Sequence, residues 1–239
     1  MLVYNISVYS WPNSILKLIE TWSRNFIWSG DISKKKLVIV SWKKCCSPYA
    51  EGGLGLRSLI SLNEASNLRL CWELIHSEAS WAKILCDRVL RNGKTITHHI
   101  SSSLWSSIKL EYMVIMENSS WQIGNGKSIQ LWEDSWCGAP LKETLDISEN
   151  VLKWLPSKVS DIIVNYTLSL PQFLVDLFPS LRGMINKITL PLEDRADRLV
   201  WMVSDNGDLS LKMAYDFKRH KFQFKSWAKI IWCKDVPPS

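Results

Sequence analysis

The stretch that decides the fold runs from Phe26-Ile27-Trp28-Ser29-Gly30, through Lys34-Lys35-Lys36 and Leu37-Val38-Ile39-Val40, to Glu51-Gly52-Gly53-Leu54-Gly55-Leu56. It joins an aromatic cluster, a lysine run, a β-branched run and a glycine triplet. Because β-branched residues favour extended backbone, we expect residues 37–40 to form a buried strand. The glycines lack the strand-to-helix context of a phosphate-binding loop, so they predict positive φ or close backbone approach instead.

Upstream of this stretch, the sequence predicts a helix that begins after Pro12 and ends at Gly30. Proline fits the first turn of a helix because its missing N–H group is not needed there. Apolar residues recur along this segment at helical spacing and predict one buried face, made of Ile15, Ile19, Trp22 and Phe26.

Downstream, three amphipathic segments follow one another and predict a helical bundle. Serines at Ser61, Ser80 and 101–103 stand at their starts, where serine caps helices well. The inward residues that we expect are Ala65, Leu68, Trp72 and Ile75, then Trp81, Ile84, Leu85 and Val89, then Trp105, Ile108, Tyr112 and Ile115.

Two later segments have the alternating pattern and the Asn-Gly turn of a β-hairpin. They span residues 121–132 and 199–211. Short helices are predicted at 159–164, 171–177, 181–188, 212–221 and 226–232. We therefore predict a mainly α fold: a helical bundle with two short β-hairpins and a second, smaller α+β block.

The proline- and glycine-containing segment 138–158 predicts a linker between two blocks. The first block is residues 1–137, which is helical and includes the hairpin 121–132. The second is residues 159–239, which is smaller and helical.

Charge is distributed unevenly along the chain, which has 239 residues and a formal net charge of +6. Residues 1–60 hold eight Lys and Arg against three Asp and Glu, and residues 212–234 hold seven against one. Residues 61–211 hold fourteen against eighteen. Two basic ends around an acidic centre favour a polyanionic partner. The alternative is two solvated faces.

Aromatic residues accompany the basic ones at both ends, and fourteen residues of the chain are tryptophan. Lysine neutralises phosphates and aromatic rings stack on bases, so this mixture indicates nucleic-acid contact. The alternative is that the aromatic rings belong to the core and the lysine stems cover it. The candidate contact residues are Lys34, Lys35, Lys36, Lys43, Lys44, Lys218, Arg219, Lys221 and Lys225.

Patterns typical of catalysis or metal binding are weak. The six cysteines lack the spacing of a structural zinc site, and their scatter indicates a reducing compartment. Glu133 and Asp134 follow a predicted strand, but neighbouring strand residues point to opposite faces, so we expect surface or hairpin-closing hydrogen bonds. Asp194 and Asp197 lie in a predicted loop. We predict no catalytic residue and no metal site.

A membrane or secreted protein is not expected. The sequence begins without a signal peptide, and no apolar run approaches the roughly 20 residues that a membrane span needs. We predict an intracellular protein without a membrane partner.

Taken in order, several motifs resemble the region after the polymerase core in plant LINE-type (non-LTR) retrotransposon reverse transcriptases. They are Phe26–Gly30, Val40-Ser41-Trp42, Gly52–Leu56, Leu62-Asn63-Glu64-Ala65 with Trp72, Trp121–Gly126 and Leu131–Trp136. The later run Gly207–Tyr215, with Trp227, Ile231-Trp232 and Pro237, is similar to the opening of the zinc-binding domain of that family.

The resemblance implies that residues 1–137 form a block like the thumb and connection beyond a polymerase. It implies that residues 159–239 end in the truncated start of a zinc-binding domain, whose ligands would lie beyond Pro238. The polymerase of that family is an RNA-directed DNA polymerase that uses Mg²⁺ at a Tyr/Phe-x-Asp-Asp motif, and that motif does not occur here. We therefore predict a non-catalytic fragment without a cofactor.

The partners that the resemblance implies are RNA or DNA and a polymerase fragment in trans, and the compartment it implies is the nucleus. Three other hypotheses remain open on the sequence. The chain is an active enzyme, alone or with that fragment; it is a helical protein-interaction module; or it is a decayed remnant with no selected function.

Overall fold

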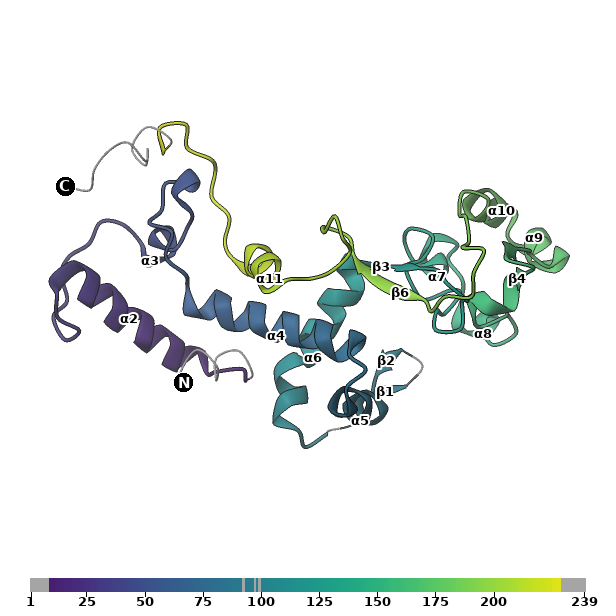
Figure 1. The fold of residues 1–239 in the computed structure, drawn as a ribbon, viewed down its shortest axis with the longest axis horizontal. Coiled ribbons are helices and arrows are strands. Elements are labelled where there is room, and N and C mark those ends of the chain that lie inside the picture. Colours follow the sequence, from purple (N-terminus) through teal and green to yellow (C-terminus); the bar gives the residue numbers. More distant parts are fainter. Residues whose placement is uncertain (1–8, 92, 97, 99, 229–239) are drawn as a thin grey trace. The chain divides into compact units, whose positions relative to one another are not determined.

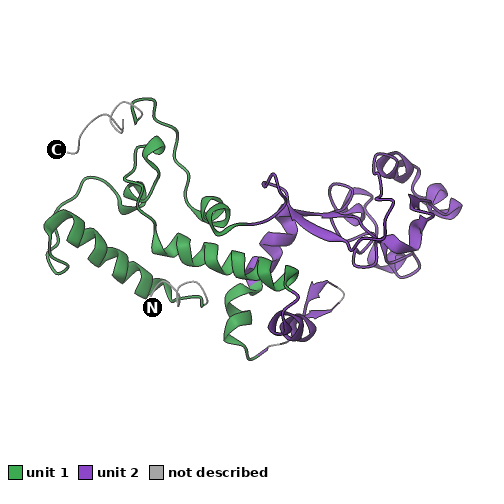
Figure 2. Ribbon diagram, viewed as in Figure 1, with its two compact units in different colours: residues 1–77, 101–109, 210–239 green, residues 78–100, 110–209 purple. Residues whose placement is uncertain are grey.

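The computed structural model describes residues 9–228 except 92, 97 and 99. Over these residues the chain is mostly helical, with three small two-stranded antiparallel sheets (Figure 1). The predicted mainly α fold class is confirmed. The chain divides into unit 1, residues 1–77, 101–109 and 210–239, and unit 2, residues 78–100 and 110–209 (Figure 2). None of the described helices is long and apolar enough to cross a bilayer.

Unit 1 is organised around helix α4 (Leu59–His76), which packs against α2 (Asn13–Ser29) and α11 (Leu211–Lys218). The hydroxyl of Ser58 caps α4 by accepting the Ser61 N–H at 3.4 Å. Serine also caps α11, because the Ser210 Oγ accepts the Met213 N–H at 3.2 Å. The predicted inward residues Ala65, Leu68 and Trp72 are buried.

Helix α2 begins and ends where the sequence predicts. Pro12 precedes it, and Gly30 ends it with a φ of 75° while donating its N–H to the Phe26 carbonyl at 2.8 Å. The predicted buried face is wrong, however: Ile15, Trp22 and Phe26 are exposed by 42%, 45% and 59%.

The side of α2 that is turned inward carries Leu16, Glu20 and Asn25 instead. Glu20, which is 9% exposed, accepts hydrogen bonds at its Oε1 from the Ser58 hydroxyl and the Leu59 N–H, each at 2.7 Å. The first N–H groups of a helix have no partner within the helix, and a carboxylate satisfies them well. Glu20 thus joins the inward side of α2 to the start of α4.

Residues 37–40 do not form the predicted strand. They lie in the loop between α2 and the short helix α3 (Trp42–Cys45), and Leu37 and Ile39 are fully exposed. A strand needs a neighbour for its N–H and C=O groups. No described strand pairs with this segment, so the β-branched pattern alone cannot produce one.

The glycine triplet has the backbone roles that the sequence predicts. It follows the 3-10 helix η1 (Tyr49–Glu51), and Gly52 and Gly55 have φ of 79° and 68°. A Cβ atom on Gly53 would lie 2.1 Å from the Ser47 carbonyl oxygen, so only glycine fits there.

Unit 2 begins with α5 (Ser80–Val89), which leads into β1 (Leu90–Arg91), the antiparallel partner of β2 (Lys94–Thr95). In α5 the predicted inward residues Leu85 and Val89 are buried, whereas Trp81 and Ile84 are exposed. The next helix, α6 (Ser103–Asn118), belongs to unit 1 up to residue 109 and to unit 2 from residue 110, and all four of its predicted inward residues are buried: Trp105, Ile108, Tyr112 and Ile115.

Neither predicted hairpin forms. Instead their first arms pair with each other: β3 (Ser119–Gln122) is antiparallel to β6 (Arg198–Trp201), with Trp121 opposite Leu199. The Asn-Gly turns are present, and Gly126 and Gly207 have φ of 72° and 76°. The local turn chemistry was therefore predicted correctly, but the partner strand lies far along the sequence.

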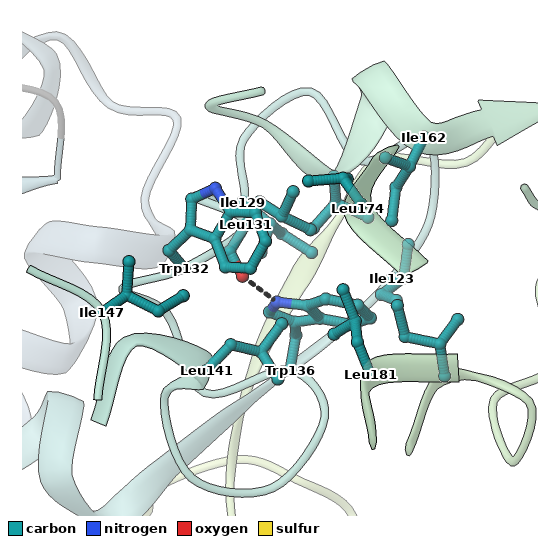
Figure 3. Packing of buried hydrophobic residues seen from close by; sticks show 12 residues of the cluster. Ile123, Ile129, Leu131, Trp132, Trp136, Leu141, Ile147, Ile162, Leu174 and Leu181 are labelled. Carbon is teal, nitrogen blue, oxygen red and sulfur yellow. Dashed lines mark hydrogen bonds between the residues drawn. The ribbon is translucent and has the colours of Figure 1, made fainter. Parts of the chain in front are cut away.

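An apolar cluster of twelve buried residues lies in unit 2 (Figure 3). The indole N–H of Trp136 donates to the Leu131 carbonyl at 2.8 Å, and that of Trp132 donates to the Pro156 carbonyl at 2.7 Å. A buried indole needs such a partner for its N–H. The other buried members are Ile123, Ile129, Leu141, Ile147, Val159, Ile162, Leu174, Leu181 and Ile185.

Residues 138–158, the predicted linker, carry the helices α7 (Leu141–Thr144) and α8 (Glu149–Leu152). Leu141 is fully buried and Ile147 is 6% exposed, so this segment contributes to the core of unit 2.

The rest of unit 2 consists of short elements. They are η2 (Val159–Ile162), β4 (Ile163–Val164) paired with β5 (Thr167–Leu168), α9 (Gln172–Leu177) and α10 (Pro179–Ile185). Helices were predicted near α9, α10 and α11, and they are confirmed there. The predicted helix 159–164 ends early, because Asn165 and Tyr166 both have positive φ and close a two-residue β-turn. The predicted helix 226–232 lies mostly outside the described residues.

Candidate nucleic-acid interface

The end of unit 1 returns to the glycine loop and brings two basic segments together. After α11, the backbone N–H of Lys225 donates to the Ala50 carbonyl at 2.9 Å. The Trp227 ring lies close to Gly52, since a Cβ atom there would be 3.0 Å from its Cη2. Residues 43–44 and 218–225, which are far apart in the sequence, therefore lie on the same part of unit 1.

Glu51 is the residue that joins them. Its carboxylate receives two hydrogen bonds from Arg219, Nη2 to Oε1 at 2.8 Å and Nη1 to Oε2 at 3.0 Å. The Phe222 N–H donates to the same carboxylate at 3.0 Å, and Arg219 also pairs with Asp216 at 2.9 Å. Both side chains of the Glu51–Arg219 pair are only 13% exposed. We call Glu51, Arg219, Asp216, Lys44 and Phe222 the Glu51 cluster.

Electrostatics within the Glu51 cluster favour the charged forms. The hydrogen bond from Arg219 lowers the pKa of Glu51, and the hydrogen bond from Glu51 raises the pKa of Arg219. Lys44 donates to the backbone carbonyl of Glu51, and its Nζ lies 4.3 Å from the Phe222 ring centroid. Lys44 and Arg219 thus hold the Glu51 cluster together. Because their charged groups are engaged with Glu51, they are less available to contact a phosphate.

The other predicted contact residues have different surroundings. Lys43 and Lys221 are exposed, and Lys225 is half-buried. Lys218 is the last residue of α11 and is half-buried. These four flank the Glu51 cluster and supply positive charge around it.

The lysine run occupies a separate place. Lys34, Lys35 and Lys36 are exposed in the loop that follows α2, and Lys34 Nζ lies 3.6 Å from Asp31 Oδ2. Among the described residues, no hydrogen bond or ion pair joins the run to the Glu51 cluster. The structure therefore brings Lys43 and Lys44 together with the basic residues of segment 218–225. The lysine run 34–36 lies elsewhere in unit 1.

A cavity of about 230 Å³ opens beside the Glu51 cluster in unit 1. Burial raises the pKa of Cys46, one of its lining residues, to about 12, so that thiol stays protonated and unreactive at neutral pH. The described cysteines are all free. Other lining residues include Glu20, Trp42, Lys43, Ile60, Tyr215 and His220.

Sequence reasoning missed Glu51, Asp216, Glu20 and Tyr215. The Tyr215 hydroxyl accepts the Ser58 N–H at 3.0 Å, a contact that ties α11 to the start of α4. Each of these residues acts on a partner far away in sequence, so no local pattern signals it. The one available hint is that an acidic residue, Glu51, interrupts a strongly basic segment.

Two carboxylates of unit 2, those of Asp134 and Asp197, accept hydrogen bonds from backbone N–H groups. Asp134 Oδ2 accepts the Gln130 N–H at 2.6 Å, and burial raises its pKa. Asp197 accepts the N–H groups of Gly124, Gly126 and Ser128, each at 2.8 Å. Within the described part of the chain, no three His, Cys, Asp or Glu residues are grouped so that they could hold a metal ion.

Comparison with known proteins finds relatives of plant origin. Over 240 aligned positions the chain is 32% identical to an Arabidopsis thaliana protein named "Putative ribonuclease H protein"; the alignment covers 90% of this chain and 36% of that protein. It is 26% identical over 139 positions to an Arabidopsis thaliana "Uncharacterized mitochondrial protein", covering 56% of this chain and 90% of that protein. No family model and no solved structure matches the chain.

Proposed function

We propose that this chain is a non-catalytic part of a plant retroelement protein, from the region after a reverse-transcriptase core, and that it binds RNA or DNA. The observation that carries the proposal is the meeting of two basic segments in unit 1, where Lys225 N–H reaches Ala50 and Arg219 reaches Glu51. A surface with this charge suits a phosphate backbone. The name of one relative refers to ribonuclease H, and we extend nucleic acid as the partner class to this chain.

In this proposal the basic residues divide into two groups with different roles. Arg219 and Lys44 hold the C-terminal segment in place through Glu51. Lys43, Lys221 and Lys225, which no ion pair engages among the described residues, contact phosphates. Lys34, Lys35 and Lys36 supply a second contact from the loop after α2.

Salt dependence of binding tests this division. Each phosphate contact to a single strand contributes about −0.7 to the slope of log K against log salt concentration. We expect the triple variant Lys43→Ala, Lys221→Ala, Lys225→Ala to reduce that slope by about 2 for a labelled single-stranded RNA in fluorescence anisotropy.

The matched control removes three exposed lysines of unit 2, Lys127→Ala, Lys153→Ala and Lys187→Ala, and should keep the wild-type slope. Equal slopes for the two triple variants would overturn the proposed interface. A third triple variant, at Lys34, Lys35 and Lys36, measures the contribution of the loop.

The non-catalytic part of the proposal has its own test. A primer-extension assay with Mg²⁺ should give no product with this chain alone. Template-dependent synthesis would show instead that the chain is an active polymerase.

Protein interaction is a second candidate function, favoured by one specific observation. Helix α2 exposes Ile15, Leu18, Trp22 and Phe26 on one side, and contiguous exposed apolar surface marks interaction sites. The simplest protein interaction through this surface is self-association of the chain. Sedimentation velocity would then show a concentration-dependent dimer that the double variant Trp22→Ser, Phe26→Ser abolishes, and a monomer at all concentrations would exclude it.

A further inference from the structure

The cavity beside the Glu51 cluster has the size of a single ring system. Its volume is about 230 Å³. An apolar cavity of about 150 Å³ binds benzene, whereas pockets for drug-sized ligands begin at about 300 Å³. The cavity therefore has room for one heteroaromatic ring but not for two.

The walls of the cavity suit a flat aromatic ligand. Trp42, Tyr215 and His220 contribute rings, and Ile60 contributes apolar surface. A π-face is common to all nucleobases, so rings of this kind bind bases without requiring a particular sequence.

Glu20 gives the cavity one polar preference. Its described hydrogen bonds, from Ser58 Oγ, Leu59 N–H and Ile60 N–H, all end at Oε1. Oε2 thus keeps its acceptor capacity, and a carboxylate accepts the exocyclic amino group of a base. Cytosine carries such a group where uracil has a carbonyl oxygen.

Lys43 completes the site. It lines the same cavity, and its side chain is exposed at the surface, where a phosphate next to an inserted base would lie. The carboxylate, the lysine and the aromatic rings of the lining come from three segments of the sequence, with Glu20 in α2, Trp42 and Lys43 side by side in α3, and Tyr215 and His220 at and after α11.

We propose that this cavity accepts one amino-bearing base of a single-stranded nucleic acid, with Glu20 accepting from the amino group and Lys43 contacting the adjacent phosphate. This inference rests on the proposed nucleic-acid function and adds a base pocket to it. In this proposal the phosphate contacts provide affinity, and the pocket distinguishes a strand that carries bases from an abasic strand.

The test compares three 8-nucleotide RNA oligomers of equal charge: all cytidine, all uridine and all abasic. Wild-type protein should bind the uridine oligomer about tenfold more tightly than the abasic one, because of base stacking, so that the cytidine oligomer binds about 100-fold more tightly than the abasic one. It should bind the cytidine oligomer about tenfold more tightly than the uridine one, because of the hydrogen bond to a charged acceptor. Equal affinity for all three would overturn the base pocket while leaving the basic interface intact. Binding of none of them would refute the proposed function itself.

Filling the cavity should remove the discrimination and spare the phosphate contacts. Ser61 lines the cavity, and Ser61→Leu should bind all three oligomers as wild type binds the abasic one, with an unchanged salt slope. Ser169→Leu, at an exposed position of unit 2, is the matched control and should discriminate as wild type does. Circular dichroism checks that both variants fold. His220→Ala, at an exposed position, provides a second variant and should weaken the preference for cytidine in the same direction.

A free nucleotide is the other source of the same chemistry. The indole N–H of Trp42 has no hydrogen-bond partner among the described residues, so its NMR signal, assigned with Trp42→Phe, reports occupation of the cavity. The cytidine oligomer should shift this signal at a far lower concentration than free cytidine monophosphate. Equal affinities for the two would show that the ligand is a free nucleotide and not a strand.

Discussion

The two units each use one carboxylate to hold distant segments together, but they use it differently. In unit 1, Glu51 binds the guanidinium of Arg219, 168 residues away, as a charged pair. In unit 2, Asp197 binds only backbone N–H groups, those of Gly124, Gly126 and Ser128. A charged pair depends on pH and on the partner side chain. A carboxylate held by N–H groups depends on the backbone conformation of the loop that presents them.

The difference shows where each unit is vulnerable. In both, a glycine makes the local geometry possible, since a Cβ atom on Gly124 would lie 2.2 Å from the Arg195 carbonyl and one on Gly53 would lie 2.1 Å from the Ser47 carbonyl. Beyond the glycines, the Glu51 contact of unit 1 relies mainly on a charged pair, and the Asp197 contact of unit 2 relies on backbone N–H donors. Variants can separate these contributions.

The largest effect should come from the two glycines. We expect Gly124→Ala and Gly53→Ala each to lower the free energy of unfolding by about 3 kcal/mol, because a backbone carbonyl must move. Urea denaturation followed by circular dichroism measures it. Gly183→Ala is the control: its Cβ would meet nothing within 4 Å in helix α10, so it should stabilise by about 0.5–1 kcal/mol. A loss with Gly183→Ala, or none with the other two, would contradict the close-approach argument.

Removing the carboxylate of unit 2 should have the next largest effect. Asp197→Ala leaves three backbone N–H groups without their acceptor, and we expect a loss of about 2 kcal/mol. Amide hydrogen exchange at Gly126 and Ser128 should accelerate, while exchange at Phe222 stays unchanged. The control is Asp194→Ala, which removes only the contact of an exposed side chain with Asn125 and should change neither quantity. Unaltered amide exchange at Gly126 in Asp197→Ala would show that Asp197 does not hold this loop in place.

Neutralising the carboxylate of unit 1 should cost less and should depend on pH. Glu51→Gln keeps the shape of the side chain, and Arg219 retains Asp216, so we expect a loss of about 1 kcal/mol at pH 7. The pKa of Glu51 in the fold lies below its ordinary value of 4.5. Its contribution is therefore present above that value and is lost as the pH falls through the lowered pKa.

The measurement is the difference in unfolding free energy between wild type and Glu51→Gln from pH 7 to pH 3. The difference in unfolding free energy should shrink toward zero near pH 3. Over the same pH range, amide hydrogen exchange at Phe222 and Lys225 should become faster in wild type. Glu78→Gln removes an exposed pair with Lys83 and should show no measurable difference at pH 7. A gap between wild type and Glu51→Gln that is independent of pH would contradict a charge-based contact.

The smallest effect should come from the apolar loop of the opening stretch. Leu37 is fully exposed, so Leu37→Ser should change the unfolding free energy by less than about 0.5 kcal/mol. Leu141→Ala, at a fully buried position of the same residue type, should cost about 2–5 kcal/mol. A large loss with Leu37→Ser would restore the idea that residues 37–40 form a buried strand.

Much of the secondary structure could be predicted from the sequence, because it depends on neighbours within a few residues. The apolar spacing of α4 and α6 and the stop at Gly30 are local, and the structure agrees with them. For the candidate site, the sequence predicted only the types of residue that take part, and not their contacts. Lysines and aromatic residues at both ends were visible, but not the fact that Glu51 engages Arg219 and Lys44.

The sequence by itself determined that the chain is mainly helical, where most helices lie, that α2 ends at Gly30, and that both ends are basic. Tertiary structure alone decided that β3 pairs with β6, that Glu20 of α2 contacts the start of α4, and that Lys43 and Arg219 line the same cavity. The physical reason is the sequence separation over which each interaction acts. Backbone preference and helical periodicity act over a few residues, whereas the choice of a partner depends on which distant groups packing brings within hydrogen-bond distance.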